Sequence, residues 1–385
     1  MIDALDRLHA EYRDRLETKA VVLDRNGIEK GIEALRRELA SGTWMVVCDE
    51  HTWAAAGERT AAALDGAGQR WVRWEPPVPP GSDEPVCDEE SVAECRETIK
   101  REGAAAALAI GSGTLNDIAK FGAYKAGLYA GCIATAPSMN GYTSGIAAVL
   151  SEGVKTTQPC TPTRVVVGDV EVLSEAPARL IQSGLGDLAS KPVSNADWIV
   201  SSRLTGSTHS TEAAKIIEES SKLLRGVAPG LARRDRNAVE RLSASLILSG
   251  FAMTVAGNSA PASGGEHLIS HYLDMVAIAN GERHDLHGCQ VGVGTITAAF
   301  LYEKLRAVDP ASIDPGALAA NLRPWKEHRA LVEERFGSLA PAVLAHAEKG
   351  YPVRATLERR LERLKAQWYE IMAELDGTLR TPEEI

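Results

Sequence analysis

Short apolar runs alternate with amphipathic segments along the first part of the chain. Between the runs, apolar residues recur at helical spacing in Ile28–Leu39, Trp53–Leu64, Glu89–Arg101 and Leu115–Ala126. Alternation of this kind predicts parallel βαβ units with helices on both faces of one sheet. The runs with the length of strands are Val21–Asp24, Trp44–Asp49, Arg70–Trp74, Ala104–Ile110 and Gly131–Thr135.

The pattern changes near residue 172. Before it, the apolar runs Ala147–Leu150 and Arg164–Val170 are expected to extend or edge the sheet. From about Ser174 onward the β-branched runs disappear. We therefore predict an α/β nucleotide-binding domain over residues 1–172 and an all-helical domain over residues 173–385. The helical segments are Glu212–Leu224, Ala238–Ala256, Glu266–Ala279, Val293–Arg306, Pro315–Asn321 and Ala355–Glu374.

Composition excludes several classes of protein. The formal net charge is -10 and no dense basic run occurs, so a nucleic-acid partner is not expected. No signal-peptide core and no uninterrupted run of about 18 apolar residues is present, so no membrane partner is expected. The 6 cysteines are far apart and form no Cys-x-x-Cys pair. This usage predicts buried free thiols and the cytoplasm.

A glycine turn follows the run Ala104–Ile110. Gly111-Ser-Gly113-Thr114 lies between this predicted strand and a predicted helix. Such a turn can hold a phosphate, because glycines let the backbone come close and the helix N-terminus favours an anion. Asn116 stands where the dinucleotide fingerprint has its third glycine. A plain strand–helix turn therefore remains the alternative.

Two more segments end predicted strands at the edge where open α/β sheets bind ligands. Asp49 follows the run from Trp44, where it could accept hydrogen bonds from an adenosine ribose or cap a helix. Thr135-Ala-Pro-Ser138 follows the run from Gly131, and its alternative role is a proline-containing turn.

The predicted helix from Glu266 carries candidate chemistry. His267 and His271 are four residues apart and share one face, with Asp274 a turn further along. The adjoining apolar stripe of Leu268, Tyr272 and Met275 is expected to face the core. Two stacked imidazoles suit a metal or a proton relay.

Further candidates lie outside that helix. His284 and His287 follow it in a loop, where a solvated side chain is the common alternative. Asp187 follows a glycine-rich turn at a helix start, where capping is the alternative role. One carboxylate and two imidazoles would leave an open position on Zn²⁺ for a substrate oxygen.

Taken together, these motifs resemble the sn-glycerol-1-phosphate dehydrogenases, in the superfamily of iron-containing alcohol dehydrogenases and 3-dehydroquinate synthases. The match extends in order from about Asp49 to Gly294. It rests on Gly111-Ser-Gly-Thr-Leu115, Thr135-Ala-Pro-Ser138, Gly186-Asp187, Glu266-His267-Leu-Ile-Ser-His271, and His287-Gly288 with Val291-Gly-Val-Gly294.

The resemblance implies a fold like that of dehydroquinate synthase, with a Rossmann-like N-terminal domain, a helical C-terminal domain and a cleft between them. It implies that Asp187, His267 and His287 are the metal ligands and, together with His271, the catalytic residues. Asn140, Asp187 and His271 are then expected to face the substrate, with His271 also catalytic, and His284 has no assigned role. Implied dinucleotide contacts are Asp49 at the adenosine end, Gly111, Ser112, Gly113, Thr114, Leu115, Thr135, Ala136, Pro137, Ser138 and Ser144.

Two positions depart from the family pattern. Asn140 stands where members carry aspartate, which keeps an acceptor but loses the charge. Pro192 follows Lys191 within a stretch that the family makes helical, so the helix is expected to kink or to restart there. The first departure bears on the substrate, and the second on the pocket wall next to Asp187.

The activity implied by the resemblance is reduction of dihydroxyacetone phosphate to sn-glycerol 1-phosphate with NAD(H) or NADP(H), in a homo-oligomer. Zn²⁺ suits the ligand set best, with Ni²⁺ and Fe²⁺ as alternatives. Lys155 and Lys191 are candidates to bind the phosphate, although most lysines are simply solvated. The alternatives are another polyol phosphate or a phosphonate as substrate, a dehydroquinate synthase-like cyclase, and a nucleotide-binding protein without catalysis.

Overall fold

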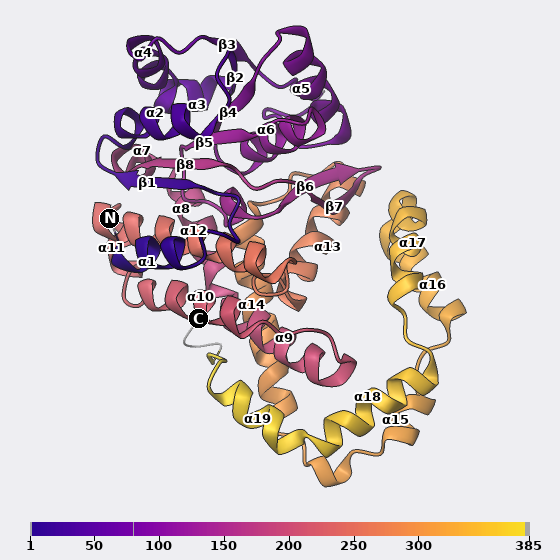
Figure 1. The fold of residues 1–385 in the computed structure, drawn as a ribbon. Coiled ribbons are helices and arrows are strands. Elements are labelled where there is room, and N and C mark those ends of the chain that lie inside the picture. Colours follow the sequence, from indigo (N-terminus) through magenta and orange to yellow (C-terminus); the bar gives the residue numbers. More distant parts are fainter. Residues whose placement is uncertain (1, 80, 382–385) are drawn as a thin grey trace.

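The computed structural model describes residues 2–79 and 81–381, and its centre is a six-stranded sheet (Figure 1). The strand order is β1-β8-β5-β4-β2-β3, and every neighbouring pair is parallel. The predicted parallel α/β sheet is confirmed. Its strands are β1 (Ala20–Asp24), β2 (Trp44–Val47), β3 (Trp71–Trp74), β4 (Ala106–Gly111), β5 (Ala130–Ala134) and β8 (Val165–Asp169).

Both faces of the sheet are buried, as expected where helices cover a parallel sheet on two sides. Along β2, Trp44 and Val46 pack into the apolar cluster that includes residues of α2 and α4. Met45 and Val47 point to the opposite face, into the cluster that includes residues of α5 and α6. This alternation follows from the two-residue period of a strand. The bounds of these helices are α2 (Gly27–Glu38), α4 (Glu58–Gly66), α5 (Glu89–Arg101) and α6 (Gly113–Lys125).

Two expectations about the sheet were wrong in detail. β8 adds a strand to the sheet, as one of the two alternatives had it, but it lies inside, between β1 and β5, and not at an edge. The run at Ala147–Leu150 is outside the sheet, in an antiparallel hairpin of β6 (Ile146–Ser151) and β7 (Val154–Pro159). Glu152 (φ 50°) and Gly153 (φ 77°) form its two-residue turn, and positive φ at both positions suits the twist of a hairpin.

After β8 the described chain is helical, which confirms the predicted all-helical C-terminal part. The last strand ends at Asp169, and the predicted domain boundary after residue 172 falls within α7 and stays a prediction. The remaining elements are α1 (Asp3–Glu11), α3 (Glu50–Thr52), η1 (Trp53–Gly57), η2 (Gly141–Thr143), α7 (Val170–Glu175), α8 (Ala178–Ala189), α9 (Lys191–Thr205), α10 (Thr211–Leu223), α11 (Ala228–Ala232), α12 (Arg236–Ala256), α13 (Gly265–Ala279), α14 (His287–Arg306), η3 (Pro310–Ser312), α15 (Pro315–Ala320), α16 (Trp325–Phe336), η4 (Gly337–Leu339), α17 (Ala340–Gly350), α18 (Arg354–Ala366) and α19 (Trp368–Asp376).

α12 is the central helix of the helical part. Among the described helices, only α12 is long and apolar enough to cross a membrane by length and composition, and 83% of its apolar window is buried inside the protein. One continuous apolar cluster joins Leu5 of α1, Met45 of β2, Ile118 of α6 and Leu242 of α12. The sheet and the helical part therefore share a core.

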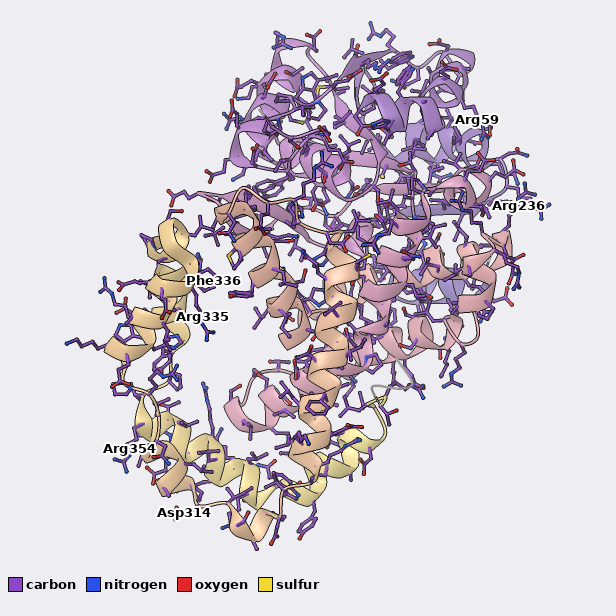
Figure 2. The ribbon with its side chains drawn as sticks, turned by 180° about the vertical axis from the view of Figure 1, so that it is seen from behind. Arg59, Arg236, Asp314, Arg335, Phe336 and Arg354 are labelled. Atoms are coloured by element: carbon purple, nitrogen blue, oxygen red, sulfur yellow. The ribbon has the colours of Figure 1, made fainter. Side chains whose placement is uncertain are left out.

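The C-terminal helices form an arm. In Figure 1, α15 to α17 curve away from α14, and α18 and α19 lead back toward α9. The arm contacts α13 again through α16, which ends at Phe336 (Figure 2). The ring of Phe336 lies 5.3 Å from the ring of Tyr272 on α13. This contact covers part of the outer side of α13.

Candidate active site

The ends of three neighbouring strands gather the predicted cofactor residues. Asp49 follows β2, Gly111 ends β4 and Thr135 follows β5, and these strands are adjacent and parallel. The chain leaves β2 toward β3 and leaves β4 toward β5, in opposite directions across the sheet. The point between β2 and β4 is therefore the topological switch point at which open α/β sheets bind ligands.

The glycine turn is joined to the loop after β5. α6 begins at Gly113, and the side chain of Ser112 does not cap it, so the first backbone N–H groups of the helix are free of a side-chain cap. Ser112 Oγ instead contacts Ser138 Oγ and lies 2.9 Å from the Tyr142 hydroxyl oxygen. Tyr142 donates its one hydroxyl hydrogen to Ala136 O at 2.7 Å. Sequence reasoning missed Tyr142, which is buried and braces both loops.

Two predicted cofactor residues are engaged within the chain. Asp49 Oδ1 accepts from Thr52 N at 2.7 Å, and Asp49 N donates to Thr52 Oγ1 at 3.0 Å. This is a capping box, so the structure shows the capping alternative, and the ribose contact stays a prediction. The Ser144 hydroxyl is buried beside Gly141 O and Ile146 O, and its cofactor contact also stays a prediction.

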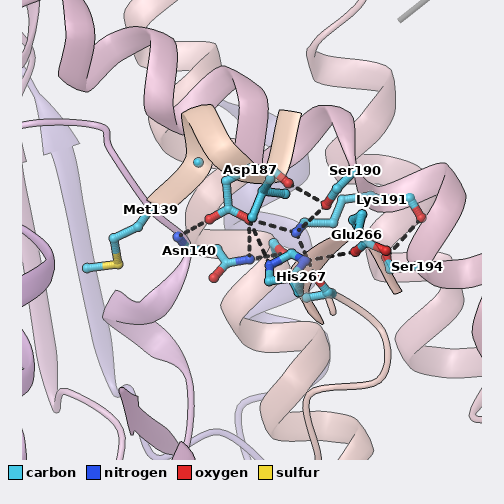
Figure 3. A network of polar contacts seen from close by, with 12 residues as sticks. Met139, Asn140, Asp187, Ser190, Lys191, Ser194, Glu266 and His267 are labelled. Carbon is cyan, nitrogen blue, oxygen red and sulfur yellow. Dashed lines mark hydrogen bonds and ion pairs between the residues drawn. The ribbon is translucent and has the colours of Figure 1, made fainter. Parts of the chain in front are cut away.

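Asp187 lies on α8, fully buried, at the centre of a polar network (Figure 3). Asn140 donates to it twice, from the backbone N to Oδ2 at 3.1 Å and from Nδ2 to Oδ1 at 3.2 Å. Lys191 Nζ lies 2.9 Å from Oδ1. Burial alone would raise the pKa of the Asp187 carboxyl, but the ammonium of Lys191 opposes this, and the pKa is lowered. Asp187 is therefore a carboxylate.

His267 and His287 come together beside Asp187. Their ring centroids lie 5.1 Å apart, and His267 Nε2 lies 3.7 Å from Asp187 Oδ1. Burial lowers the pKa of His267 to about 3 and that of His287 well below the ordinary value. Both rings are therefore neutral at pH 7 and can offer a lone pair.

Neighbouring side chains orient both rings. His267 Nδ1 lies 2.8 Å from Glu266 Oε1, so it carries the hydrogen and leaves Nε2 as the lone-pair nitrogen. Ser270 donates to Gln290 Oε1 at 2.9 Å and therefore accepts from His287 Nδ1 at 3.1 Å. Metal-binding imidazoles generally have such an outer partner. Sequence reasoning missed Glu266 and Ser270 in this role, although both lie within three residues of His267.

His271 completes the imidazole group. Its ring lies 6.1 Å from that of His287, and burial, with Lys155 as the next cause, lowers its pKa to about 4. His271 is only partly buried, so the group is open on this side. His284 lies apart on an exposed loop, with Nδ1 3.5 Å from Asp274 Oδ1.

The expectation that an apolar stripe of α13 faces the core was wrong. Leu268 is 69% exposed, whereas the buried residues of the helix include His267, Ser270 and Asp274. These three follow helical spacing, so α13 turns a polar face inward. That orientation is explained by the group of side chains that it meets there.

Glycines let the helices of the site approach closely. A Cβ at Gly186 would lie 2.2 Å from Gly288 O, and one at Gly288 would lie 1.8 Å from Ser183 O. Only glycine allows such contact between the backbones of α8 and α14, which carry Asp187 and His287. A Cβ at Gly184 would likewise lie 1.9 Å from Pro137 O, which places α8 against the predicted cofactor loop.

The departure at Pro192 has a clear structural result. α8 ends at Ala189, and α9 restarts at Lys191 with the proline in its first turn, as one of the two expectations had it. Lys191 is fully buried and donates to Asp187 Oδ1, Ser190 Oγ and Ala262 O. Its spacing of four residues from Asp187 was the available signal for this ion pair.

The side chains gathered here are of the types that bind divalent metals. One carboxylate and two neutral imidazoles are ligands of Zn²⁺ and of related cations. Among the described residues, no three or more His, Cys, Asp or Glu side chains already stand at the spacing of a formed metal site. Two ligands of a tetrahedral zinc lie about 3.4 Å apart, and the 3.7 Å from His267 to Asp187 is slightly wider. The donor types fit, and the three side chains would have to move closer together to hold one cation.

Comparison with known proteins identifies the family. The model of the iron-containing alcohol dehydrogenase family matches residues 22–177. An NAD(P)+ glycerol-1-phosphate dehydrogenase of Bacillus licheniformis is 32% identical over 293 residues, which cover 75% of this chain and 72% of that protein. Its counterpart from Thermofilum pendens is 34% identical over 285 residues, covering 74% and 78%.

Solved structures show the same fold. Glycerol dehydrogenase from Schizosaccharomyces pombe aligns with a TM-score of 0.60 at 16% identity, over 94% of this chain and 92% of that one. A structure of an iron containing alcohol dehydrogenase also aligns at 0.60, with 15% identity, over 96% and 95%. The chain therefore belongs to the glycerol-1-phosphate dehydrogenase family among the iron-containing alcohol dehydrogenases, and it is an NAD(P)-dependent alcohol dehydrogenase.

Proposed function

We propose that this enzyme reduces dihydroxyacetone phosphate, or a closely related phosphorylated ketone, to sn-glycerol 1-phosphate. The observation that carries the proposal is the meeting of Asp187, His267 and His287 in one buried group. The printed names of relatives at 32% and 34% identity support the substrate class.

Asp187, His267 and His287 would hold a divalent cation, with Zn²⁺ the best match and Ni²⁺ or Fe²⁺ as alternatives. When bound, the cation supplies Lewis-acid polarisation of the substrate carbonyl. The chain keeps both imidazoles neutral by burial, and Glu266 and Ser270 bind the two Nδ1 atoms, which leaves each Nε2 as the lone-pair nitrogen.

Lys191 changes the charge of this site. Its ammonium cancels the carboxylate of Asp187, so the side chains that hold the cation carry almost no net charge. A bound divalent cation would then keep most of its positive charge for the substrate. That charge favours a substrate that carries a phosphate dianion.

Asn140 and His271 would face the substrate. Both amide hydrogens of Asn140 have acceptors, in Asp187 and in Ser249 at 3.2 Å, so the side chain can offer a substrate hydroxyl its Oδ1 acceptor. His271 is neutral at pH 7 because its pKa is about 4. It would relay a proton from water to the oxygen that becomes the new hydroxyl, through its two ring nitrogens. It would not donate a proton from a ring that is already protonated at pH 7.

The Gly111–Leu115 turn and the Thr135–Ser138 loop would hold the dinucleotide, whose nicotinamide supplies the hydride. The uncapped start of α6 offers backbone N–H groups and the positive end of the helix dipole to its phosphates. The contacts of Tyr142 with Ser112 and Ala136 keep the two loops together.

The test is a substrate panel with purified, metal-replete enzyme. NADH and NADPH are each supplied with dihydroxyacetone phosphate, dihydroxyacetone, a pentulose phosphate and a keto-phosphonate, and loss of nicotinamide absorbance is followed. We expect turnover to be fastest with dihydroxyacetone phosphate, and its product to be inert to an sn-glycerol-3-phosphate dehydrogenase. Faster turnover of an unphosphorylated ketone would contradict the proposal.

Asn140 favours one second candidate. Because the amide lacks the charge of the family aspartate, the enzyme could act on another polyol phosphate or on a phosphonate. The same panel decides this, through a higher kcat/KM for that substrate. A cyclase is disfavoured, because dehydroquinate synthases place glutamate where Asp187 stands, and steady NADH consumption would exclude it.

A further inference from the structure

Two lysines lie close to the imidazole group, and they differ in how many N–H donors of the ammonium remain without an acceptor. Lys191 uses three acceptors, Asp187 Oδ1, Ser190 Oγ and Ala262 O, which match the three donors of an ammonium. Lys155 has one hydrogen bond in the described part of the chain, to Asp274 Oδ2 at 2.7 Å. Its side chain is 21% exposed, so it can still receive a ligand from solvent.

Lys155 reaches the site from the β6–β7 hairpin. It lies on β7, and the β6–β7 hairpin packs against α13, the helix that carries His267 and His271. After burial, the Lys155 ammonium is the next cause that lowers the pKa of both His271 and His287. His271 forms the open side of the group and lies one turn from Asp274, to which Lys155 is bonded, so Lys155 stands beside this opening.

Asp274 holds Lys155 there although one of its own carboxylate oxygens lacks a hydrogen bond. Its side chain is 3% exposed, its Oδ2 accepts from Lys155, and its Oδ1 is buried with no hydrogen bond among the described residues, with His284 Nδ1 3.5 Å away. A buried carboxylate oxygen without a donor is unfavourable. Asp274 is one turn from His271 on the inward face of α13, so it fixes the ammonium beside the reacting end of the site.

We propose that Lys155, positioned by Asp274, binds the phosphate of the substrate and sets the preference for phosphorylated over unphosphorylated ketones. In such a ketone one carbon and one ester oxygen separate the carbonyl from the phosphorus, so both groups fit within one small site. Two free N–H donors and a positive charge suit phosphate oxygens. This inference rests on the proposed function.

The decisive variant is Lys155→Met, which removes the ammonium and keeps the length of the side chain. We expect kcat/KM for dihydroxyacetone phosphate to fall on the order of 10- to 100-fold, mainly through KM, as for loss of a charged hydrogen bond. For unphosphorylated dihydroxyacetone, kcat/KM should change less than about threefold. Lys155→Arg should restore much of the loss, and Lys100→Met on the outer face of α5 is the matched control.

A second variant tests the positioning role. Asp274→Asn keeps the size and removes the charge, and it should raise KM for the phosphorylated ketone alone. Binding of inorganic phosphate, measured by its competition with dihydroxyacetone phosphate, should weaken in both variants, while NADH binding by fluorescence stays unchanged.

The outcomes distinguish a failure of this inference from a failure of the proposed function. If the wild-type enzyme prefers phosphorylated ketones and Lys155→Met keeps that preference, the phosphate binds elsewhere and this inference alone is overturned. An equal loss with both ketones also overturns it, because Lys155 would then serve the fold or the chemistry. If the wild-type enzyme shows no preference for phosphate, the proposed function itself fails.

Discussion

Lys191 Nζ lies 2.9 Å from Asp187 Oδ1, and both side chains are fully buried one helical turn apart across the α8–α9 junction. The carboxylate that would hold a metal thus already has a cation beside it. Removing one member of a buried ion pair leaves an uncompensated charge, which costs about 3–5 kcal/mol.

Lys191→Met should therefore lower the free energy of unfolding of metal-free enzyme by about 3–5 kcal/mol. A divalent cation would restore the missing positive charge, so Zn²⁺ should raise the Tm of the variant more than that of the wild type. Calorimetry with and without Zn²⁺ measures both effects. Equal Zn²⁺-induced shifts in the two proteins would show that Lys191 and the metal do not share Asp187.

Asp187→Asn and His267→Ala should abolish turnover, with losses on the order of 10³-fold or more, because each removes a ligand that helps to polarise the carbonyl. Dinucleotide binding should stay mostly intact, since the Gly111 turn belongs to the sheet and not to α8 or α13. Steady-state kinetics and NADH fluorescence give the two readouts. Parallel loss of cofactor binding in folded variants would count against the metal assignment.

Metal-free enzyme should lose stability as the pH falls below about 6.5, the ordinary pKa of histidine. His267, His271 and His287 have lowered pKa values in the folded state, so the unfolded chain takes up their protons first. Their contribution is complete above pH 6.5 and declines as the pH falls toward about 4, where His271 titrates, and about 3, where His267 titrates.

Each such imidazole contributes up to about 1.4 kcal/mol per pH unit in that window. Urea unfolding at several pH values from 7.5 down measures the slope, and His271→Gln should reduce it. A stability that stays constant between about pH 7 and 5 would contradict the burial of neutral rings.

Gly288→Ala should destabilise the enzyme by about 1–3 kcal/mol or more, because the new Cβ would lie 1.8 Å from Ser183 O. It should also lower kcat/KM, since α8 and α14 would separate and carry Asp187 away from His287. Gly292→Ala on the same helix is the control, because its Cβ would meet only Gly186 Cα at 3.6 Å. Thermal unfolding and kinetics on both variants check this, and similar effects at the two positions would refute the role given to close helix contact.

Hydrophobic periodicity predicted most elements well, because it reports the local geometry of a strand or helix. Glu89–Arg101 was predicted with the bounds that α5 has, and Ile28–Leu39 differs from α2 by one residue at each end. The strand β7 was missed, because Val154–Pro159 is largely polar, has only one buried residue and contains no apolar run. That strand carries Lys155.

The amino-acid sequence by itself determined the βα alternation, the helical second part and the order of the motifs that place the chain in its family. Those features depend on neighbouring residues and on spacing along one chain. Tertiary packing alone decided that β8 runs inside the sheet and that α13 turns its polar face inward. It also turned the four-residue spacing of Asp187 and Lys191 into a fully buried ion pair. Each of these depends on contacts between segments distant in the chain or on how a helix restarts. Close backbone contact at Gly186 and Gly288 allows α8 and α14 to bring Asp187 and His287 together.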